Sequence, residues 1–140
     1  MPERVRDIMT PDPVSVSESA SLRHAAEVMR DHDIGDVLVV GQDGRLSGIL
    51  TDRGVVVDGL AAGADPDSAT GGEICSRDLV TIGPDQAAVE ASRLMADKAI
   101  RRLPVLVDGS LVGIVSLGDL AEERDPESVL GEISEAPPNN

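Results

Sequence analysis

The side chains best suited to hold a ligand stand in a phrase that the chain contains twice. It reads GIVSLGDL from Gly113 to Leu120 and GILTDRGV from Gly48 to Val55. In the later copy, Ser116 precedes Asp119 by three residues, which places a hydroxyl and a carboxylate on the same side of a helical turn. The amide groups at the start of that helix favour an anion, and the opening glycine permits a close backbone approach. These residues are therefore the first candidates for a binding site.

The earlier copy keeps the hydroxyl and lacks the acid. Thr51 corresponds to Ser116, whereas Gly54 stands where the later copy has Asp119. Asp52 lies two positions from the proper register, so it replaces the missing carboxylate only in part. The two copies are thus expected to differ in binding.

The composition argues against several other kinds of chemistry. Cys75 is the only cysteine, and His24 and His32 have no cysteine cluster or HExxH pattern near them, so neither a disulfide nor a metal site is expected. The chain shows no activated nucleophile and no acid–base constellation, so we do not expect an enzyme. A net charge of −14 and the absence of Phe, Tyr and Trp disfavour nucleic-acid binding. The N-terminus is charged and broken by prolines, and no apolar run approaches the roughly 20 residues of a membrane span, which predicts a cytoplasmic protein with no membrane partner.

The elements that must position the candidate residues are themselves repeated. A shift of 66 positions places Ile8 on Ile74 and, after one residue is lost in a hairpin loop, a shift of 65 places Gly48 on Gly113. Each copy predicts a strand, a helix, two strands joined by an Asp-Gly turn, and a closing helix. The predicted elements are strands at 14–16 and 80–82, helices N-capped by Ser19 and Asp85, strands at 37–40, 46–51, 103–107 and 111–116, and closing helices at 52–62 and 117–124.

One such repeat cannot cover both faces of its sheet. Two copies can do so by packing together, so we expect a mixed α/β (α+β) fold of two pseudo-symmetric βαββα repeats packed sheet to sheet in one compact module. The repeats are expected at residues 7–64 and 73–130, joined by a turn-rich linker at 65–72. Residues 131–140 are expected to form a disordered tail.

At this point the pattern resembles a known family. A repeated βαββα unit that closes with glycine, two aliphatic residues, Ser or Thr, two variable residues and Asp is similar to the cystathionine-β-synthase (CBS) domain. Two in tandem resemble a CBS pair, or Bateman module. The resemblance covers residues 3–125 and includes IRRLPV at 100–105, while TDRGVVVDGLAAGADPDSATGGEI is similar to small stand-alone CBS pairs of the hypoxic response protein type. It implies a cleft between the repeats with two pockets, which bind adenine nucleotides in many members.

The resemblance also assigns residues to the second of these pockets. The implied ligand-binding residues are Val80, Thr81 and Ile82 along the adenine, Arg101 and Arg102 at the phosphate, and Ser116 and Asp119 at the ribose. Neighbouring ribose hydroxyls donate charge-assisted hydrogen bonds to a short carboxylate. The alternative for the arginine pair is that it only pairs with surface acids such as Asp97.

The first pocket is expected to be degraded. Its implied residues are Val14, Ser15, Val16, Thr51, Asp52 and Arg53. Gly54 replaces the ribose acid, and Gly35 and Asp36 replace the two arginines. A ribonucleotide should therefore bind there weakly or not at all.

Two classes of function follow from this interpretation. The leading hypothesis is a regulatory protein without an obligatory cofactor, which binds AMP, ADP or ATP and signals to a separate partner protein. A binder of S-adenosylmethionine is a variant of it. The alternative is a ligand-free interaction or stress-response protein. In both cases the apolar faces of Asp52–Leu60 and Leu117–Glu123 predict a homodimer.

Overall fold

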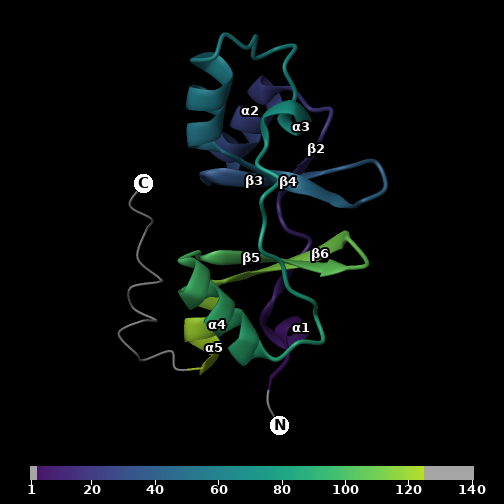
Figure 1. The fold of residues 1–140 in the computed structure, drawn as a ribbon, viewed down its shortest axis with the longest axis vertical. Coiled ribbons are helices and arrows are strands. Elements are labelled where there is room, and N and C mark those ends of the chain that lie inside the picture. Colours follow the sequence, from purple (N-terminus) through teal and green to yellow (C-terminus); the bar gives the residue numbers. More distant parts are fainter. Residues whose placement is uncertain (1–2, 125–140) are drawn as a thin grey trace. The chain divides into compact units, whose positions relative to one another are not determined.

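Each sequence repeat contributes a small sheet covered by helices in the computed structural model, which describes residues 3–124 (Figure 1). The chain divides into two compact units. One is residues 14–79, and the other combines residues 3–13 with residues 80–124. The expected tail at 131–140 and the expected end of the second repeat at 125–130 lie outside the described residues.

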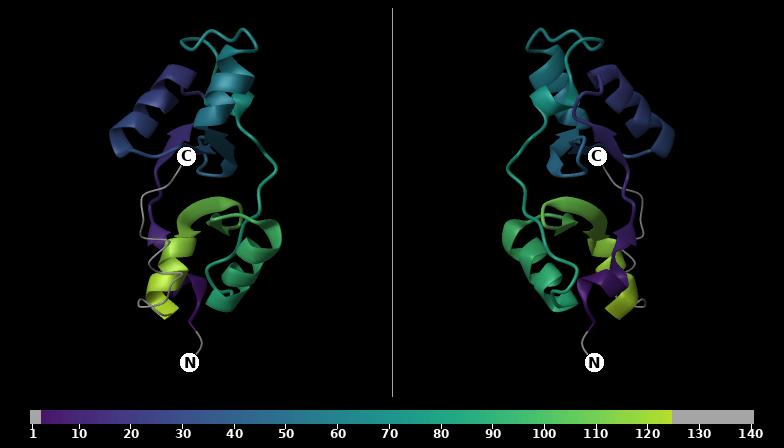
Figure 2. Two further views of the ribbon diagram at one scale, coloured as in Figure 1. Left: turned by 90° about the vertical axis from the view of Figure 1, so that its left-hand side faces the viewer. Right: turned by 90° about the vertical axis from the view of Figure 1, so that its right-hand side faces the viewer.

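The unit of residues 14–79 contains a three-stranded sheet in the order β2-β3-β4. Strand β2 (Ser15–Ser17) runs parallel to β3 (Asp36–Val40), which pairs antiparallel with β4 (Leu46–Thr51). Helix α2 (Leu22–His32), the π-helix η1 (Gly54–Leu60) and helix α3 (Gly71–Ile74) lie on one face of this sheet (Figure 2). The spacing of the apolar residues at 22, 25, 26 and 29 predicts one buried face of α2; Leu22, Ala25 and Met29 are buried, whereas Ala26 is exposed.

The other unit contains a three-stranded sheet in the order β1-β6-β5. The short strand β1 (Thr10–Pro11) and strand β5 (Arg102–Val107) both pair antiparallel with β6 (Ser110–Ser116). The helices of this unit are α1 (Val5–Ile8), α4 (Ala88–Lys98) and α5 (Leu117–Arg124). Together with the two sheets, they confirm the predicted mixed α/β class.

Both predicted hairpins are confirmed, and their turns use backbone conformations that the sequence supplies. Gly44 has φ +81°, and Asp108 and Gly109 have φ +50° and +86°. Asp and Gly tolerate this left-handed region better than other residues, which is why Asp-Gly predicts a tight hairpin.

Two other local predictions are wrong. Ser21, rather than Ser19, caps α2 by accepting a hydrogen bond from the His24 amide at 3.1 Å, because the Ala20 amide donates to Ser17 O and holds the preceding residues in a turn. In the second repeat the cap position is Ala87 rather than Asp85; the Asp85 side chain instead pairs with Arg6.

The strand predicted at 80–82 is also wrong in extent. It is reduced to a single parallel bridge between Ile82 and Val105. The Ile82 amide donates to Pro104 O at 3.1 Å, and the Leu106 amide donates to Ile82 O at 2.9 Å. The segment therefore follows β5 for only one pair of hydrogen bonds.

One strand of each sheet pairs with a short segment that comes before the other repeat in the sequence. Ser76 exchanges two backbone hydrogen bonds of 2.9 Å with Ile49 on β4, and β1 pairs with β6. These segments explain the glycine that opens each repeated phrase. A Cβ on Gly48 would lie 2.4 Å from Ser76 O, and one on Gly113 would lie 2.6 Å from Met9 Sδ.

The boundaries of the compact units consequently differ from the boundaries of the sequence repeats. Residues 7–13, which the sequence analysis assigns to the first repeat, belong to the unit of the second repeat. Residues 73–79 belong to the unit of the first. The 65–72 segment is a packed part of its unit, because the Leu22 amide donates to Ala69 O at 3.0 Å and the Arg23 guanidinium binds both carboxylate oxygens of Asp67. The hydrogen bond from Arg23 lowers the pKa of Asp67.

Candidate functional site

The candidate ribose-binding residues of the second repeat form a closed pair at the start of α5. The Ser116 amide donates to Asp119 Oδ2 at 2.9 Å, and the Asp119 amide donates to Ser116 Oγ at 3.1 Å. This reciprocal arrangement is a helix capping box. Sequence reasoning treated the two residues only as ligand contacts, although a Ser followed three residues later by an acid is also the pattern of such a cap.

Capping does not use up the hydrogen-bonding capacity of this pair. A carboxylate has two oxygens and a hydroxyl has a proton of its own. Among residues 3–124, no hydrogen bond engages Asp119 Oδ1, and the Ser116 hydroxyl acts only as an acceptor. Both side chains are half-buried. The pair can therefore hold a polyhydroxyl ligand while it continues to cap α5.

The arginine pair lies at the start of the strand next to this cap, where Arg101 precedes β5 and Arg102 is its first residue. Arg102 lies opposite Ser116 in the β5–β6 pairing, and the Leu117 amide donates to Arg101 O at 2.9 Å. The backbone thus joins the start of α5 to the start of β5. Both arginine side chains are exposed, and within residues 3–124 Arg101 forms no salt bridge with Asp97 or another acid.

The predicted adenine wall follows the other edge of β5. Ile82 is 3% exposed and bridges Val105, whereas Val80 and Thr81 are half-buried. Strand β5 therefore lies between this segment and β6. The structure brings Ser116, Asp119 and the arginine backbones together at one end of β5, and it places residues 80–82 along the opposite edge.

The first repeat keeps the frame of this site without its acid. Thr51 Oγ1 accepts a hydrogen bond from the Gly54 amide at 2.9 Å, but Gly54 has no side chain to return one. The Asp52 amide donates to Gly35 O at 2.9 Å, which corresponds to the hydrogen bond from the Leu117 amide to Arg101 O in the second repeat. The Asp52 carboxylate accepts from the Arg53 amide at 2.7 Å. It is therefore turned toward the local backbone.

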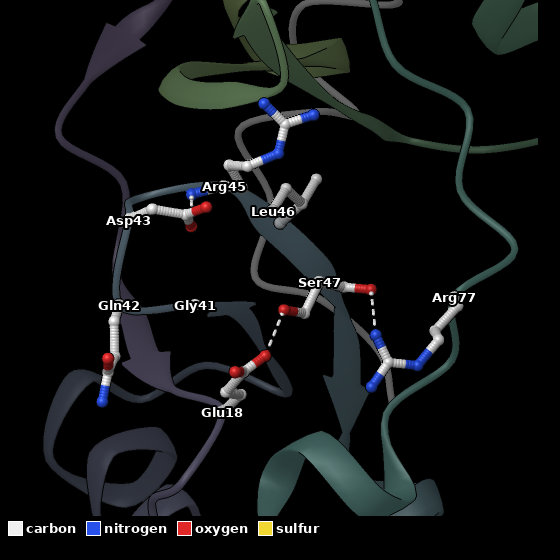
Figure 3. A pocket seen from close by; sticks show the side chains of 8 residues that line it. All are labelled: Glu18, Gly41, Gln42, Asp43, Arg45, Leu46, Ser47 and Arg77. Atoms are coloured by element: carbon white, nitrogen blue, oxygen red, sulfur yellow. Dashed lines mark hydrogen bonds between the residues drawn. The ribbon is translucent and has the colours of Figure 1, made fainter.

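A cavity of about 510 Å³ lies at neither of these places. It is found at the β3–β4 hairpin end of the first repeat (Figure 3). None of its lining residues is a predicted site residue. We assign the candidate nucleotide site from the capped helix start, because that place supplies the acceptors and the helix start that a ribose phosphate needs.

Other kinds of site find little support in the described part of the chain. Residues 3–124 contain no group of three His, Cys, Asp or Glu side chains arranged to hold a metal ion. Cys75 is buried, as its alignment with the apolar Met9 suggests, and burial raises the pKa of its thiol. None of the helices within these residues has the length and apolar character that crossing a membrane requires.

Comparison with known proteins identifies the repeat. The family model described as CBS domain matches residues 5–57 and 72–125. The chain belongs to the CBS domain family. Hypoxic response protein 1 of Mycobacterium tuberculosis is 39% identical over 125 residues, which cover 89% of this chain and 87% of that protein. The CBS domain-containing protein YhcV of Bacillus subtilis is 42% identical over 117 residues, which cover 84% and 82%.

Solved structures show the same fold. The crystal structure of Hypoxic Response Protein I with two coordinated zinc ions has a TM-score of 0.77 and 41% identity, covering 86% of this chain and 98% of that one. The CBS domain pair of protein MJ0100, in complex with 5′-methylthioadenosine and S-adenosyl-L-methionine, has a TM-score of 0.73 and 26% identity, covering 91% and 100%. The two matched segments make this chain a CBS pair.

Proposed function

We propose that this CBS pair is a regulatory module that binds an adenine nucleotide at its second repeat and signals to a separate partner protein. The observation that carries the proposal is the Ser116–Asp119 pair, which caps α5 and still offers a carboxylate oxygen and a hydroxyl proton. The related CBS pair of MJ0100, which is bound to adenosyl compounds, supports an adenosine-containing ligand.

Each residue of the site has a distinct part in this binding. The two ribose hydroxyls donate to Asp119 Oδ1 through charge-assisted hydrogen bonds, and Ser116 donates its hydroxyl proton to the ligand. Arg101 binds the phosphate, and residues 80–82 supply an aliphatic wall for adenine. Because the cap is already formed, little ordering is needed when the ligand binds.

The charge of the ligand distinguishes nucleotides from S-adenosylmethionine. Arg101 and Arg102 lie at the start of the strand beside the cap, and two guanidinium groups favour a phosphate over a sulfonium cation. We therefore place AMP, ADP and ATP before S-adenosylmethionine. The first repeat, which has Gly54 instead of an acid, is expected to remain empty at the same ligand concentration.

A second candidate function is a ligand-free dimeric interaction protein. The observation that favours it is the exposed apolar surface of η1, where Val56, Val57 and Leu60 are 55%, 42% and 49% exposed. Such side chains need a cover in a stable assembly. This surface is also compatible with a nucleotide-binding homodimer, so ligand binding decides between the two functions.

Calorimetric titration of the protein with AMP, ADP, ATP and S-adenosylmethionine tests the proposal. The wild type should bind one nucleotide per chain, and both Asp119→Ala and Asp119→Asn should weaken binding about tenfold or more, because each removes the charged acceptor. Asp119→Asn keeps an oxygen that can accept from the Ser116 amide, so its melting temperature should remain above that of Asp119→Ala. Protein concentration must be measured by refractometry, since the chain has no Trp or Tyr.

Thr51→Ala provides a control in the first repeat. It removes the hydroxyl that corresponds to that of Ser116 and should leave the nucleotide affinity unchanged. If none of the four ligands produces heat or a thermal shift, the nucleotide proposal is wrong and the interaction protein becomes the leading function.

A further inference from the structure

The cavity at the hairpin of the first repeat is built from three separate segments of one unit. Glu18 follows β2, residues 41–47 form the β3–β4 hairpin, and Arg77 follows α3. The cavity has a volume of about 510 Å³ (Figure 3). Its lining residues are Glu18, Gly41, Gln42, Asp43, Arg45, Leu46, Ser47 and Arg77.

A chain of hydrogen bonds holds three of these residues, Arg77, Ser47 and Glu18. Arg77 Nη1 donates to Ser47 O at 3.3 Å, and Nη2 donates to Gly72 O at 2.8 Å. Ser47 Oγ donates to Glu18 Oε2 at 2.8 Å. Long surface side chains lose conformational entropy when they are held in this way. The arrangement is therefore preorganised before any ligand arrives.

The second repeat shows that the CBS fold does not require these residues. Pro84, Val112 and Pro11 occupy the positions that correspond to Glu18, Ser47 and Arg77. The second repeat forms the equivalent hairpin and edge bridge without this network. Glu18, Ser47 and Arg77 are thus not required to form the hairpin or the edge bridge of this sheet.

Two acids, Glu18 and Asp43, and two arginines, Arg45 and Arg77, line the cavity, and Arg45 belongs to the same hairpin as Asp43. A Cβ on Gly41 would lie 3.2 Å from Asp43 Oδ1 and 3.6 Å from Glu18 Oε2, so both carboxylates lie close to this glycine. Asp43 Oδ1 also accepts a hydrogen bond from the Arg45 amide at 3.0 Å. Neither acid takes part in a salt bridge within residues 3–124. Figure 3 shows the Arg77 guanidinium on the other side of Ser47. A guanidinium has five N–H donors, and two of those of Arg77 are used by Ser47 O and Gly72 O.

We propose that this cavity binds a small zwitterion of the amino-acid type. The ammonium group lies over Gly41 between Glu18 and Asp43, and the carboxylate binds the remaining N–H groups of Arg77. A metal ion fits less well, because the described residues provide two carboxylates there and no third His, Cys, Asp or Glu ligand. A simple anion would face both acids within a protein of net charge −14. This inference does not depend on nucleotide binding at the second repeat.

Amide chemical shifts of the ¹⁵N-labelled full chain test the proposal with three probes of nearly equal size. Alanine carries both charges, alaninamide only the ammonium group, and lactate only the carboxylate. Alanine should cause saturable shifts confined to the amides of residues 18, 41–47 and 77, and each singly charged probe should bind at least fivefold more weakly. Equal shifts with alaninamide, or shifts with alanine that do not saturate or that spread over the acidic surface, would overturn the proposal.

Single charge removals identify the residues that bind. Glu18→Gln and Arg77→Gln should each weaken alanine binding at least fivefold, while the same spectra report whether the variant is folded. Asp97→Asn and Lys98→Gln on α4 remove one charge of each sign elsewhere and serve as matched controls. Unchanged alanine affinity in folded Glu18→Gln and Arg77→Gln would refute the assignment.

Discussion

At the scale of the residue, Gly54 accounts for the difference between the two copies of the repeated phrase. Thr51 and Ser116 both accept a hydrogen bond from the amide three residues later. Only Asp119 has a side chain that accepts a hydrogen bond from the amide of the hydroxyl residue. The same missing carboxylate removes half of a helix cap and the acceptor that we propose for ribose. The proposed ligand binding and the local stability therefore depend on the same side chain.

Gly54→Asp should complete the cap of the first repeat. A Cβ at Gly54 would lie 3.2 Å from Thr51 Oγ1 and 3.8 Å from Leu50 Cδ1, so a side chain fits after a small shift of Thr51. We expect a free energy of unfolding about 0.5–1 kcal/mol higher than that of Gly54→Ala, which fills the same space without a carboxylate. Urea unfolding followed by far-UV circular dichroism measures the difference. A Gly54→Asp variant no more stable than Gly54→Ala would contradict the capping argument, whatever the protein binds.

At the scale of the element, hydrophobic spacing predicted what the helices bury but not how they begin or wind. The spacing of Leu22, Ala25, Ala26 and Met29 predicted α2, and all of these except Ala26 are buried. The residue that caps α2 depends on a turn before it, which the Ser-rich sequence leaves open. Hydrophobic spacing also did not predict the close approach of η1 to α2, where a Cβ on Gly59 would lie 2.9 Å from Leu22 Cδ1. Spacing within one element contains no information about such a contact.

The exposed apolar residues of η1 predict the surface of a homodimer. Val56→Glu places a charge on this surface and should shift the protein from dimer to monomer at micromolar concentration, since a buried unpaired carboxylate is costly. Val89→Glu on α4, where the valine is 46% exposed, introduces the same charge outside this surface and should leave the dimer intact. Light scattering after size-exclusion chromatography measures both masses. A wild-type mass near that of the monomer would exclude the dimer.

At the scale of the whole molecule, the repeated sequence and the compact units are offset from each other. The internal repeat predicted two sheets with their helices, and both are present. It assigned residues 7–13 to the first repeat and residues 73–79 to the second, because sequence order was the only guide. The structure gives α1 and β1 to the sheet of the second repeat, and α3 and Ser76 to the sheet of the first. The candidate ribose site therefore belongs to a unit that includes α1 and β1.

Paired substitutions in α1 and α3 test this offset. Ile8 is 8% exposed in the core of the second repeat's unit, and Ile74, at the corresponding position, packs against the core of the first. Ile8→Ala should cost about 2–5 kcal/mol and lower the hydrogen-exchange protection of β5 and β6, while β3 and β4 keep theirs. Ile74→Ala should show the reverse pattern, with a smaller loss because its side chain is only half-buried. If Ile8→Ala instead loosened β3 and β4, the N-terminal segment would belong to the first repeat, as the order of the sequence suggests.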